Sequence, residues 1–354
     1  MSRYLMIDIG AGTMDILYYD DTFPQHYKAV VKSPVIQVAE QIEAISGKLL
    51  VTGSEMGGGP VTRILKAHAK TDTVVISRSA AATLNHDVKK IEGWGITVVS
   101  DMEAENLKND TAFSHVYASD LNLDRLANIV RGLGVPFSFD VVGVCAQDHG
   151  VPPKGVSHLD FRHKRFVKLL GPAPFPDTLL YEKAEIPREM NRLRSIAHQA
   201  ALLPTTDVYV MDSGMAAILG ASTDLAARGK HHRIVLDVAT SHTVAAVLAD
   251  REIAGFFEYH THDITLERLE SLIRNLADGN LSHAQILSEG GHGCYLRQKV
   301  GFDHIEAIIA TGPKRSIVHD SDLPVIYGAP MGDNMMTGTA GLLSAINARK
   351  NIEK

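Results

Sequence analysis

The sequence predicts an α/β protein made of two similar halves, with a large insertion in the first half. Its 354 residues are more than one compact core usually holds, so two domains are expected. Apolar runs near the start follow the order β-β-β-α-β-α-β, and a similar order returns after residue 232. A long middle segment, about residues 80–205, fits neither half. The halves agree in the order of their elements and not residue by residue.

The composition excludes several classes of protein. Hydrophobic residues make up 45% of the chain and charged residues 21%, which is typical of a globular protein. The net charge is −6 and no long basic run occurs, so no nucleic-acid partner is expected. No signal segment and no apolar run of about 20 residues is found, so no membrane partner is expected. Two cysteines are too few for a disulfide framework, which favours a cytoplasmic location.

The apolar patterns of the first half and of the middle segment predict their strands and helices. Strands are expected at 4–9, 14–19, 26–32, 48–52 and 73–77, with a helix at 35–46 and another opened by Pro60. The middle is expected to hold strands at 96–100 and 139–146, a helix at 123–134, and irregular Pro- and His-rich segments at 148–166 and 171–177. Such long loops are often functional or mobile, and a decorative insertion is the alternative.

The second half predicts three strands joined by short turns, at 233–238, 243–249 and 252–257. A helix at 264–278, strands at 307–311 and 324–328, and a closing helix at 334–348 follow. We therefore expect a first domain at 1–222 that includes the insertion 80–205, a second domain at 223–337, and a helix at 338–354 that returns to the first domain.

The N-terminal stretch Asp8-Ile9-Gly10-Ala11-Gly12-Thr13-Met14-Asp15 predicts a phosphate-binding turn. A dinucleotide turn would need a helix and a third glycine, and a Walker loop would need Lys before Ser or Thr; neither is present. The turn therefore joins two antiparallel strands, and its glycines let backbone N–H groups face phosphate oxygens. Asp8 and Asp15 suit Mg²⁺ held through its waters. A tight hairpin without a ligand is the alternative.

A phosphate hairpin at the start of such a half resembles the first motif of the actin, sugar-kinase and heat-shock-chaperone ATPase superfamily, which has a ribonuclease H-like fold. The stretch VYVMDSGMAAILGA (208–221) resembles its first connecting helix, and LDVATSHTVAAVL (236–248) its second phosphate motif. VIYGAPMGD (325–333) resembles its adenosine motif, and GTAGLLSAINA (338–348) its second connecting helix. The resemblance implies an actin-like ATPase with a nucleotide between the halves.

The resemblance also implies roles for individual residues, with ATP and Mg²⁺ as cofactors. Asp8 and Asp237 would hold hydrated Mg²⁺, and Asp212 would act as the general base. The phosphates would be contacted by residues of both hairpins, namely Gly10, Gly12, Thr13, Asp15, Thr240, Ser241 and His242. The adenosine would be flanked by Gly328, Gly332 and Asp333.

The second hairpin departs from the superfamily pattern. It has Ala239-Thr240-Ser241-His242 where glycines and a Thr are usual, and Val244 replaces the second acid. Thr240 and Ser241 offer hydroxyl donors in place of backbone approach. Weak, altered or lost nucleotide binding is therefore an open alternative.

The whole chain resembles a prokaryotic family of this superfamily that is loosely labelled as related to the pyruvate formate-lyase activating enzyme. AQDHG (146–150), EGGHG (289–293) and GDNMMTG (332–338) carry this resemblance. A radical cluster needs three closely spaced cysteines, and Cys145 and Cys294 are far apart, so one chain cannot supply it. A cluster shared by two chains stays open.

Other residues predict a substrate site. Gly57, Gly58 and Gly59 precede a helix and are expected to hold a substrate's anionic group, together with Arg63; a flexible turn is the alternative. We also expect Asp148, His149 and His292 to meet across the cleft and bind substrate, with two separate surface histidines as the alternative. Although the chain has 17 histidines, it contains no HExxH motif and no compact set of metal ligands is expected.

Three classes of function follow from these patterns. They are a small-molecule kinase, an activator ATPase that acts on a partner enzyme, and a non-catalytic binding protein with a degenerate nucleotide site. A small-molecule substrate or a partner enzyme is the expected partner, and a homodimer stays open.

Overall fold

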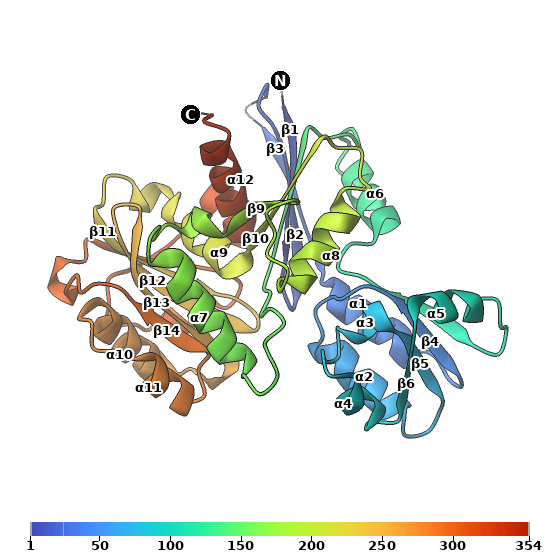
Figure 1. Ribbon diagram of the computed structural model, residues 1–354. Helices are drawn as coiled ribbons and strands as arrows, with labels where there is room; N and C mark the ends of the chain where they lie inside the picture. Colours follow the sequence, from blue (N-terminus) through green and yellow to red (C-terminus); the bar gives the residue numbers. More distant parts are fainter. Residues whose placement is uncertain (1, 24, 353–354) are drawn as a thin grey trace.

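The computed structural model describes residues 2–23 and 25–352, which form three sheets (Figure 1). The first sheet has the order β3 (His26–Lys32), β2 (Thr13–Asp20), β1 (Arg3–Ile9), β8 (Val141–Ala146), β10 (Asp207–Asp212), β9 (Leu180–Glu182). The second has the order β14 (Gly293–Leu296), β13 (Glu252–His260), β12 (His242–Ala249), β11 (His232–Val238), β15 (Ala307–Thr311), β16 (Val325–Tyr327).

The two large sheets share one topology. In each, three consecutive antiparallel strands are followed by two strands that run parallel to the first of the three. Asp8 in β1 pairs with Asp15 in β2, and Asp237 in β11 pairs with Val244 in β12 at the equivalent register. This duplication confirms the predicted actin-like, ribonuclease H-like α/β fold.

Two helices lie between the large sheets: α9 (Ser213–Ser222) and α12 (Thr337–Arg349) (Figure 1). They cross with their main chains in contact, because a Cβ on Gly220 would lie 1.8 Å from the carbonyl oxygen of Thr337. A Cβ on Gly341 would likewise lie 1.9 Å from the carbonyl oxygen of Ala216. Only glycine allows so close an approach at these two positions.

Other helices cover the outer faces of the large sheets. They are α6 (Leu123–Gly132) and α8 (Asn191–Ala200) in the first half, and α10 (Leu266–Ala277) and α11 (His283–Ser288) in the second. The amphipathic helix α10 buries Leu269, Leu272, Ile273 and Leu276, the spacing of one helical face. No helix in the described ranges is long and apolar enough to span a membrane.

The four-stranded sheet forms an additional unit beside the first sheet (Figure 1). Its parallel strands have the order β6 (Ile96–Val99), β5 (Val74–Ser77), β4 (Leu49–Gly53), β7 (Ser114–Ala118). The helices of this unit are α1 (Pro34–Glu43), α2 (Gly59–His68), α3 (Arg78–Ala81), α4 (Val88–Glu92) and α5 (Asp101–Leu107). We call residues 34–118 the inserted unit.

The inserted unit corrects the predicted start of the insertion. The strands expected at 48–52 and 73–77 belong to the inserted sheet, whereas the strand expected at 139–146 belongs to the first large sheet. The extra material therefore begins near residue 34 and not near residue 80. Strands buried on both faces have similar apolar runs in any parallel sheet, so the local pattern does not tell which sheet they join.

A second correction concerns residues 148–166, which were expected to be irregular. Helix α7 runs from His158 to Leu170 and packs against β14 of the second half. It begins after Ser157, whose hydroxyl accepts a hydrogen bond from the N–H of Asp160 at 3.0 Å. The buried face of this helix is formed by Arg162, Phe166 and Leu170. Because one of the three is charged, the sequence does not show the apolar repeat that is typical of a helix.

Candidate functional site

A cleft of about 600 Å³ lies between the two large sheets and the inserted unit. Its lining includes the first hairpin turn with Asp8 and Asp15, and the second hairpin turn with Asp237. The Gly-rich turn of the inserted unit, residues 55–60, also lines the cleft. The structure thus brings together the two predicted phosphate hairpins and the predicted substrate turn.

The two hairpins have the same turn. The N–H of Gly10 donates to the carbonyl of Thr13 at 2.9 Å, and the N–H of Ala239 donates to the carbonyl of His242 at 3.1 Å. The tips of the turns meet, because a Cβ on Gly12 would lie 2.8 Å from Oγ1 of Thr240. Predicted residues Thr13, Ser241 and His242 also line the cleft beside this contact.

Three carboxyl groups from the two halves share the cleft. Burial raises the pKa of Asp8 to about 7 and that of Asp237 to about 6. Burial, with the nearby Asp8 charge, raises the pKa of Asp15 to about 8. Oγ1 of Thr311 donates to Asp237 at 3.1 Å, whereas Oδ1 of Asp15 is buried without a hydrogen-bond partner. Such under-neutralised carboxyl groups fit a hydrated divalent cation, and Asp8 and Asp237 would hold it.

Asp212 is placed differently from its predicted role. It is buried at the start of α9, where Oδ1 accepts the N–H of Met215 at 3.2 Å and Oδ2 pairs with Arg162 at 2.8 Å. Its side chain is not part of the cleft lining. A general base needs an oxygen within reach of the reacting proton, so this geometry favours a structural role for Asp212 and corrects its prediction as the base.

Arg162 is a residue next to the cleft that sequence reasoning missed. Its guanidinium joins Asp212 to Glu258 of β13, 3.4 Å away, and also donates to the carbonyl of Asp148. The side chain therefore links α7, the first sheet and the second sheet. Because both carboxylates are buried with it, this cluster fixes the back of the cleft.

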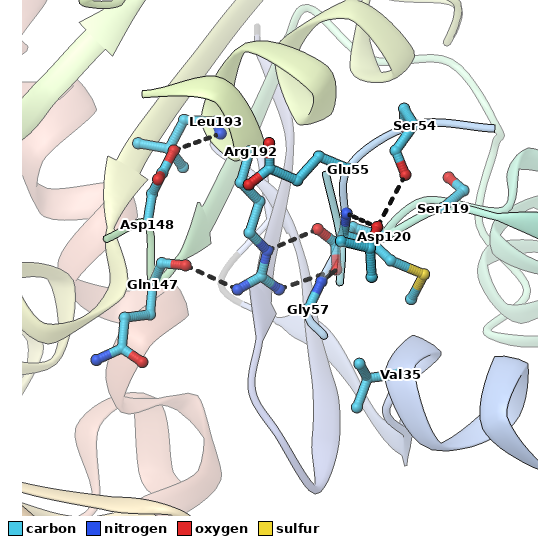
Figure 2. Close-up of polar contacts among 12 residues, drawn as sticks. Val35, Ser54, Glu55, Gly57, Ser119, Asp120, Gln147, Asp148, Arg192 and Leu193 are labelled. Atoms are coloured by element: carbon cyan, nitrogen blue, oxygen red, sulfur yellow. Dashed lines mark hydrogen bonds and ion pairs between the residues drawn. The ribbon is translucent and has the colours of Figure 1, made fainter. Parts of the chain in front are cut away.

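Arg192 of α8 forms the side of the cleft next to the inserted unit (Figure 2). Its Nε and one terminal nitrogen donate to both oxygens of Asp120, at 2.8 and 2.9 Å. The other terminal nitrogen donates to the carbonyl of Gln147, directly after β8. The N–H of Gly57 donates to Asp120 as well, at 3.3 Å. The carboxylate of Asp120 therefore already accepts one of the N–H groups of the turn that was predicted to bind an anion.

The predicted substrate residues are only partly brought to the cleft. Gly57, Gly58, Gly59, Asp148 and His149 line it. Asp148 is buried, and its carboxylate accepts the N–H groups of Gly150 and Leu193. Arg63 is exposed on α2, because Val61 and Leu65 form the buried face of that helix. Arg192, and not Arg63, is the guanidinium at the cleft.

The inserted sheet turns its ligand-binding edge toward the cleft. The chain leaves β4 on one side toward β5 and β6, and returns on the other side at β7. The loops after β4 and β7 therefore separate at this point, the topological switch point where α/β sheets bind ligands. Both loops, with Gly57 and Asp120, meet Arg192 here.

The predicted adenosine residues do not line the cleft. Gly328 and Gly332 lie beyond it, and Asp333 accepts the N–H of Met335 at 2.9 Å as the cap of a short turn. Gly312 and Pro313, which follow β15, line the cleft instead. The strand β15 runs next to β11, whereas β16 is at the edge of the sheet. The loop after the inner strand therefore reaches the cleft.

Histidines from both halves meet at one end of the cleft. The rings of His149 and His292 are 6.1 Å apart, as predicted for a shared site. His242 and His260 are cross-strand partners in β12 and β13, and His292 lies against both rings. The expectation that no compact set of metal ligands exists was wrong. Burial lowers the pKa of His242 to about 3 and also lowers the pKa values of His149 and His292.

Comparisons with known proteins give one family and several distant structures. A family model described as "Putative pyruvate format-lyase activating enzyme (DUF1786)" matches residues 56–317. An inorganic polyphosphate/ATP-glucomannokinase from Arthrobacter sp. strain KM is 12% identical, with a TM-score of 0.37, 99% of this chain covered and 100% of that chain. The ethanolamine utilization protein EutJ from Carboxydothermus hydrogenoformans is 10% identical, with a TM-score of 0.34 and coverage of 97% and 89%.

A ROK family glucokinase from Streptomyces griseus, in complex with glucose and AMPPNP, is 12% identical, with a TM-score of 0.36 and coverage of 98% of this chain and 99% of that chain. No curated protein matched the chain. Likenesses this distant carry no argument about substrate, so the function rests on the geometry of the cleft.

Proposed function

This chain belongs to the family described as "Putative pyruvate format-lyase activating enzyme (DUF1786)", and we propose that it binds Mg–ATP in the cleft between its halves and hydrolyses it or transfers a phosphoryl group. The observation that carries the proposal is the meeting of Asp8, Asp15 and Asp237, from two hairpins of identical form, in one cleft. Asp15 is buried and Asp8 and Asp237 are half-buried. Three such carboxyl groups repel one another and a polyanion, so a cation is needed between them.

Each element of the cleft has a place in this proposal. Asp8 and Asp237 hold Mg²⁺ through water, and the ion neutralises phosphate charge. The turns at Gly12 and Ser241 face the phosphates from opposite sides, and Gly312 borders the nucleoside. Asp15 has a buried oxygen without a partner, which makes it the carboxyl group best placed to accept a proton.

We place the second substrate at the switch-point edge of the inserted sheet. This wall presents Glu55, which pairs with His86 at 3.1 Å, and the Arg192 guanidinium. A small polar molecule suits such a wall of charged and hydrogen-bonding groups better than an apolar one does. We therefore favour a small-molecule acceptor over a partner enzyme.

The family description names an activating enzyme, which raises the question whether the two cysteines could hold a radical cluster. Cys145 lies in β8 and Cys294 in β14, so the two thiols belong to different sheets. Both are buried and free, at 0% and 3% exposure. A cluster shared between two chains would need thiols at the surface, so our proposal includes no radical chemistry through cysteine.

Calorimetric titration of the full chain with ATP, with and without Mg²⁺, tests the proposal together with an assay of ADP formation, which detects both hydrolysis and phosphoryl transfer. Asp8→Asn keeps the shape of the side chain and removes its charge. We expect Mg²⁺-dependent affinity to fall at least tenfold in this variant with the fold intact. The matched control is Asp124→Asn, an exposed acid on α6, which should bind as the wild type does. Equal Mg–ATP affinity in Asp8→Asn and the wild type would remove the hairpin as the phosphate site.

A second candidate function is nucleotide binding without turnover. It is favoured by Thr240, whose side chain fills the space beside Gly12, and by Val244 at the position equivalent to Asp15. The same titration separates the two candidates. Tight Mg–ATP binding with no ADP formation, in the presence of candidate sugars and other polyols, would support the binding protein over the enzyme.

A further inference from the structure

Three imidazoles of the second half converge at the end of the cleft. His242, His260 and His292 each offer a ring nitrogen, and these nitrogens all lie within 4.8 Å of one another. Nε2 of His260 and Nε2 of His292 are 2.9 Å apart. We propose that this trio, the His242 site, binds a divalent transition metal of the zinc type, separately from the Mg²⁺ proposed at the aspartates.

The backbone explains why these three residues meet. His242 opens β12 and His260 ends β13, and the two are paired across the ladder. His292 precedes β14, and its N–H donates to the carbonyl of Glu258 at 2.8 Å, which fixes it beside the same strand end. The flanking Gly293 has φ 135°, a conformation that suits glycine. The ring positions are therefore set by the sheet and not by a mobile loop.

The hydrogen-bond state of the rings fits metal ligands. Nε2 of His242 is buried and has no hydrogen-bond partner. Two ligands at about 2.0–2.1 Å from a tetrahedral zinc would have nitrogens about 3.3 Å apart, close to the separation of His260 and His292. Imidazole nitrogen favours zinc, cobalt or nickel over magnesium, which prefers oxygen.

A buried carboxylate supports the trio from behind. Oε1 of Glu258 lies 3.9 Å from Nδ1 of His292, within ion-pair reach but beyond hydrogen-bond distance, and this buried nitrogen has no hydrogen-bond partner. Glu258 itself is held by Arg162 and by the side-chain amide of Gln147. A carboxylate on the far nitrogen of a ligating histidine orients the ring and raises its basicity.

The fourth side of the site faces the cleft. His149 comes from the first half, and its ring is 6.1 Å from that of His292. His149, His242 and Glu258 all line the cleft. Three protein ligands with one open position are typical of zinc that binds a water or a substrate oxygen. The metal would therefore present an oxygen of the bound substrate beside the second hairpin, with His149 as its neighbour.

Titration of the metal-stripped full chain with Zn²⁺ alone, in the absence of nucleotide, tests this site. We expect one zinc per chain, and visible absorption bands of tetrahedral Co²⁺ when cobalt is added instead. His242→Ala and His260→Ala should each weaken zinc binding about 100-fold or more. Glu258→Gln should weaken it about 10- to 100-fold, as expected for an orienting partner.

His262→Ala is the matched control, because this histidine is two residues from His260 but its side chain is 75% exposed beside Asp263. It should bind zinc as the wild type does. Equal zinc affinity in His242→Ala, His260→Ala and the wild type would overturn the proposal, and so would the absence of tetrahedral Co²⁺ bands in the wild type. Because the assay uses no ATP, its failure leaves the nucleotide proposal standing, and a loss of ATP binding leaves this one standing.

Discussion

The tips of the two hairpins touch at Gly12 and Thr240, where a Cβ added to Gly12 would lie 2.8 Å from Oγ1 and 2.9 Å from Cγ2 of Thr240. This contact is made between the two halves, and both residues line the cleft together with Asp8, Asp15 and Asp237. Because Thr240 fills the space beside Gly12, the first turn has no room for a side chain at this position.

The Gly12–Thr240 contact predicts a strong coupling between substitutions at these positions. Gly12→Ala should weaken Mg–ATP binding roughly tenfold, because the added methyl group pushes the hairpins apart. Thr240→Ala should have a small effect alone and should restore much of the loss when combined with Gly12→Ala, a coupling of about 0.5–3 kcal/mol. The affinities of the four proteins in a double-mutant cycle measure it. Additive effects would show that the tips do not touch in solution.

The raised pKa values of the cleft acids predict a pH-dependent stability. A carboxyl group whose folded pKa exceeds its unfolded value of about 3.9 favours the folded state at low pH, and this stability is lost as pH rises through the folded pKa. For Asp15, with a pKa of about 8, the loss spans roughly pH 4 to pH 8.

Asp15→Asn should therefore stabilise the nucleotide-free protein at pH 8.5 by about 1–3 kcal/mol, and by much less at pH 5. Urea unfolding at the two pH values measures the difference. A stabilisation that is the same at both pH values would contradict the assignment of the effect to titration of Asp15.

Asp212→Asn tests the structural role of the Arg162 ion pair. Removal of one charge from this buried pair should destabilise the protein by about 3–5 kcal/mol, because Arg162 then keeps only its longer ion pair with Glu258. The control is Asp124→Asn, an exposed acid on α6, which should change stability little. Unchanged stability with turnover reduced about 100-fold would instead support Asp212 as the general base.

Gly338→Ala tests the fit between α12 and Asp8. A Cβ at this position would lie 2.0 Å from Oδ2 of Asp8, so the carboxylate must leave its position. We expect Mg–ATP affinity to fall at least tenfold, although alanine itself favours a helix. Gly132→Ala is the control, since a Cβ there meets nothing within 4 Å at the end of α6. Calorimetry on both variants decides, and equal affinity in Gly338→Ala and the wild type would contradict the fit.

Much of the duplicated fold could be predicted because it is encoded locally. The turn around Gly10 and Gly12, the strand leading to Asp212 and the small residues of α12 each have a short, readable pattern. The inserted sheet could not be separated from the first sheet, because strand partners are chosen by tertiary packing. The role of Arg162 was hidden because a buried charge breaks the apolar period of α7.

The three histidines of the His242 site could not be brought together from the sequence, because their meeting depends on the register of β12 and β13. Ala249 pairs with Glu252 next to the tight turn, and a regular antiparallel ladder continued from there would pair His242 with residue 259. An irregularity between Val247 and Leu248 shifts the pairing by one, to His260. A shift of one residue moves a side chain to the other face of a sheet, so the convergence is visible only once the bulge is known.

The glycine crossing of α9 and α12 has a mechanical consequence. Side chains that interlock must be pulled out of one another before two bodies can turn, but the contact of Gly220 with Gly341 is main chain on main chain. We expect such a contact to let the halves rotate about the crossing of α9 and α12 with little resistance, because no side chains interlock at these two glycines. The contacts of the hairpin tips and of the histidines would then set the rate at which the cleft opens and a product leaves. The crossing of the two helices would contribute little to that rate.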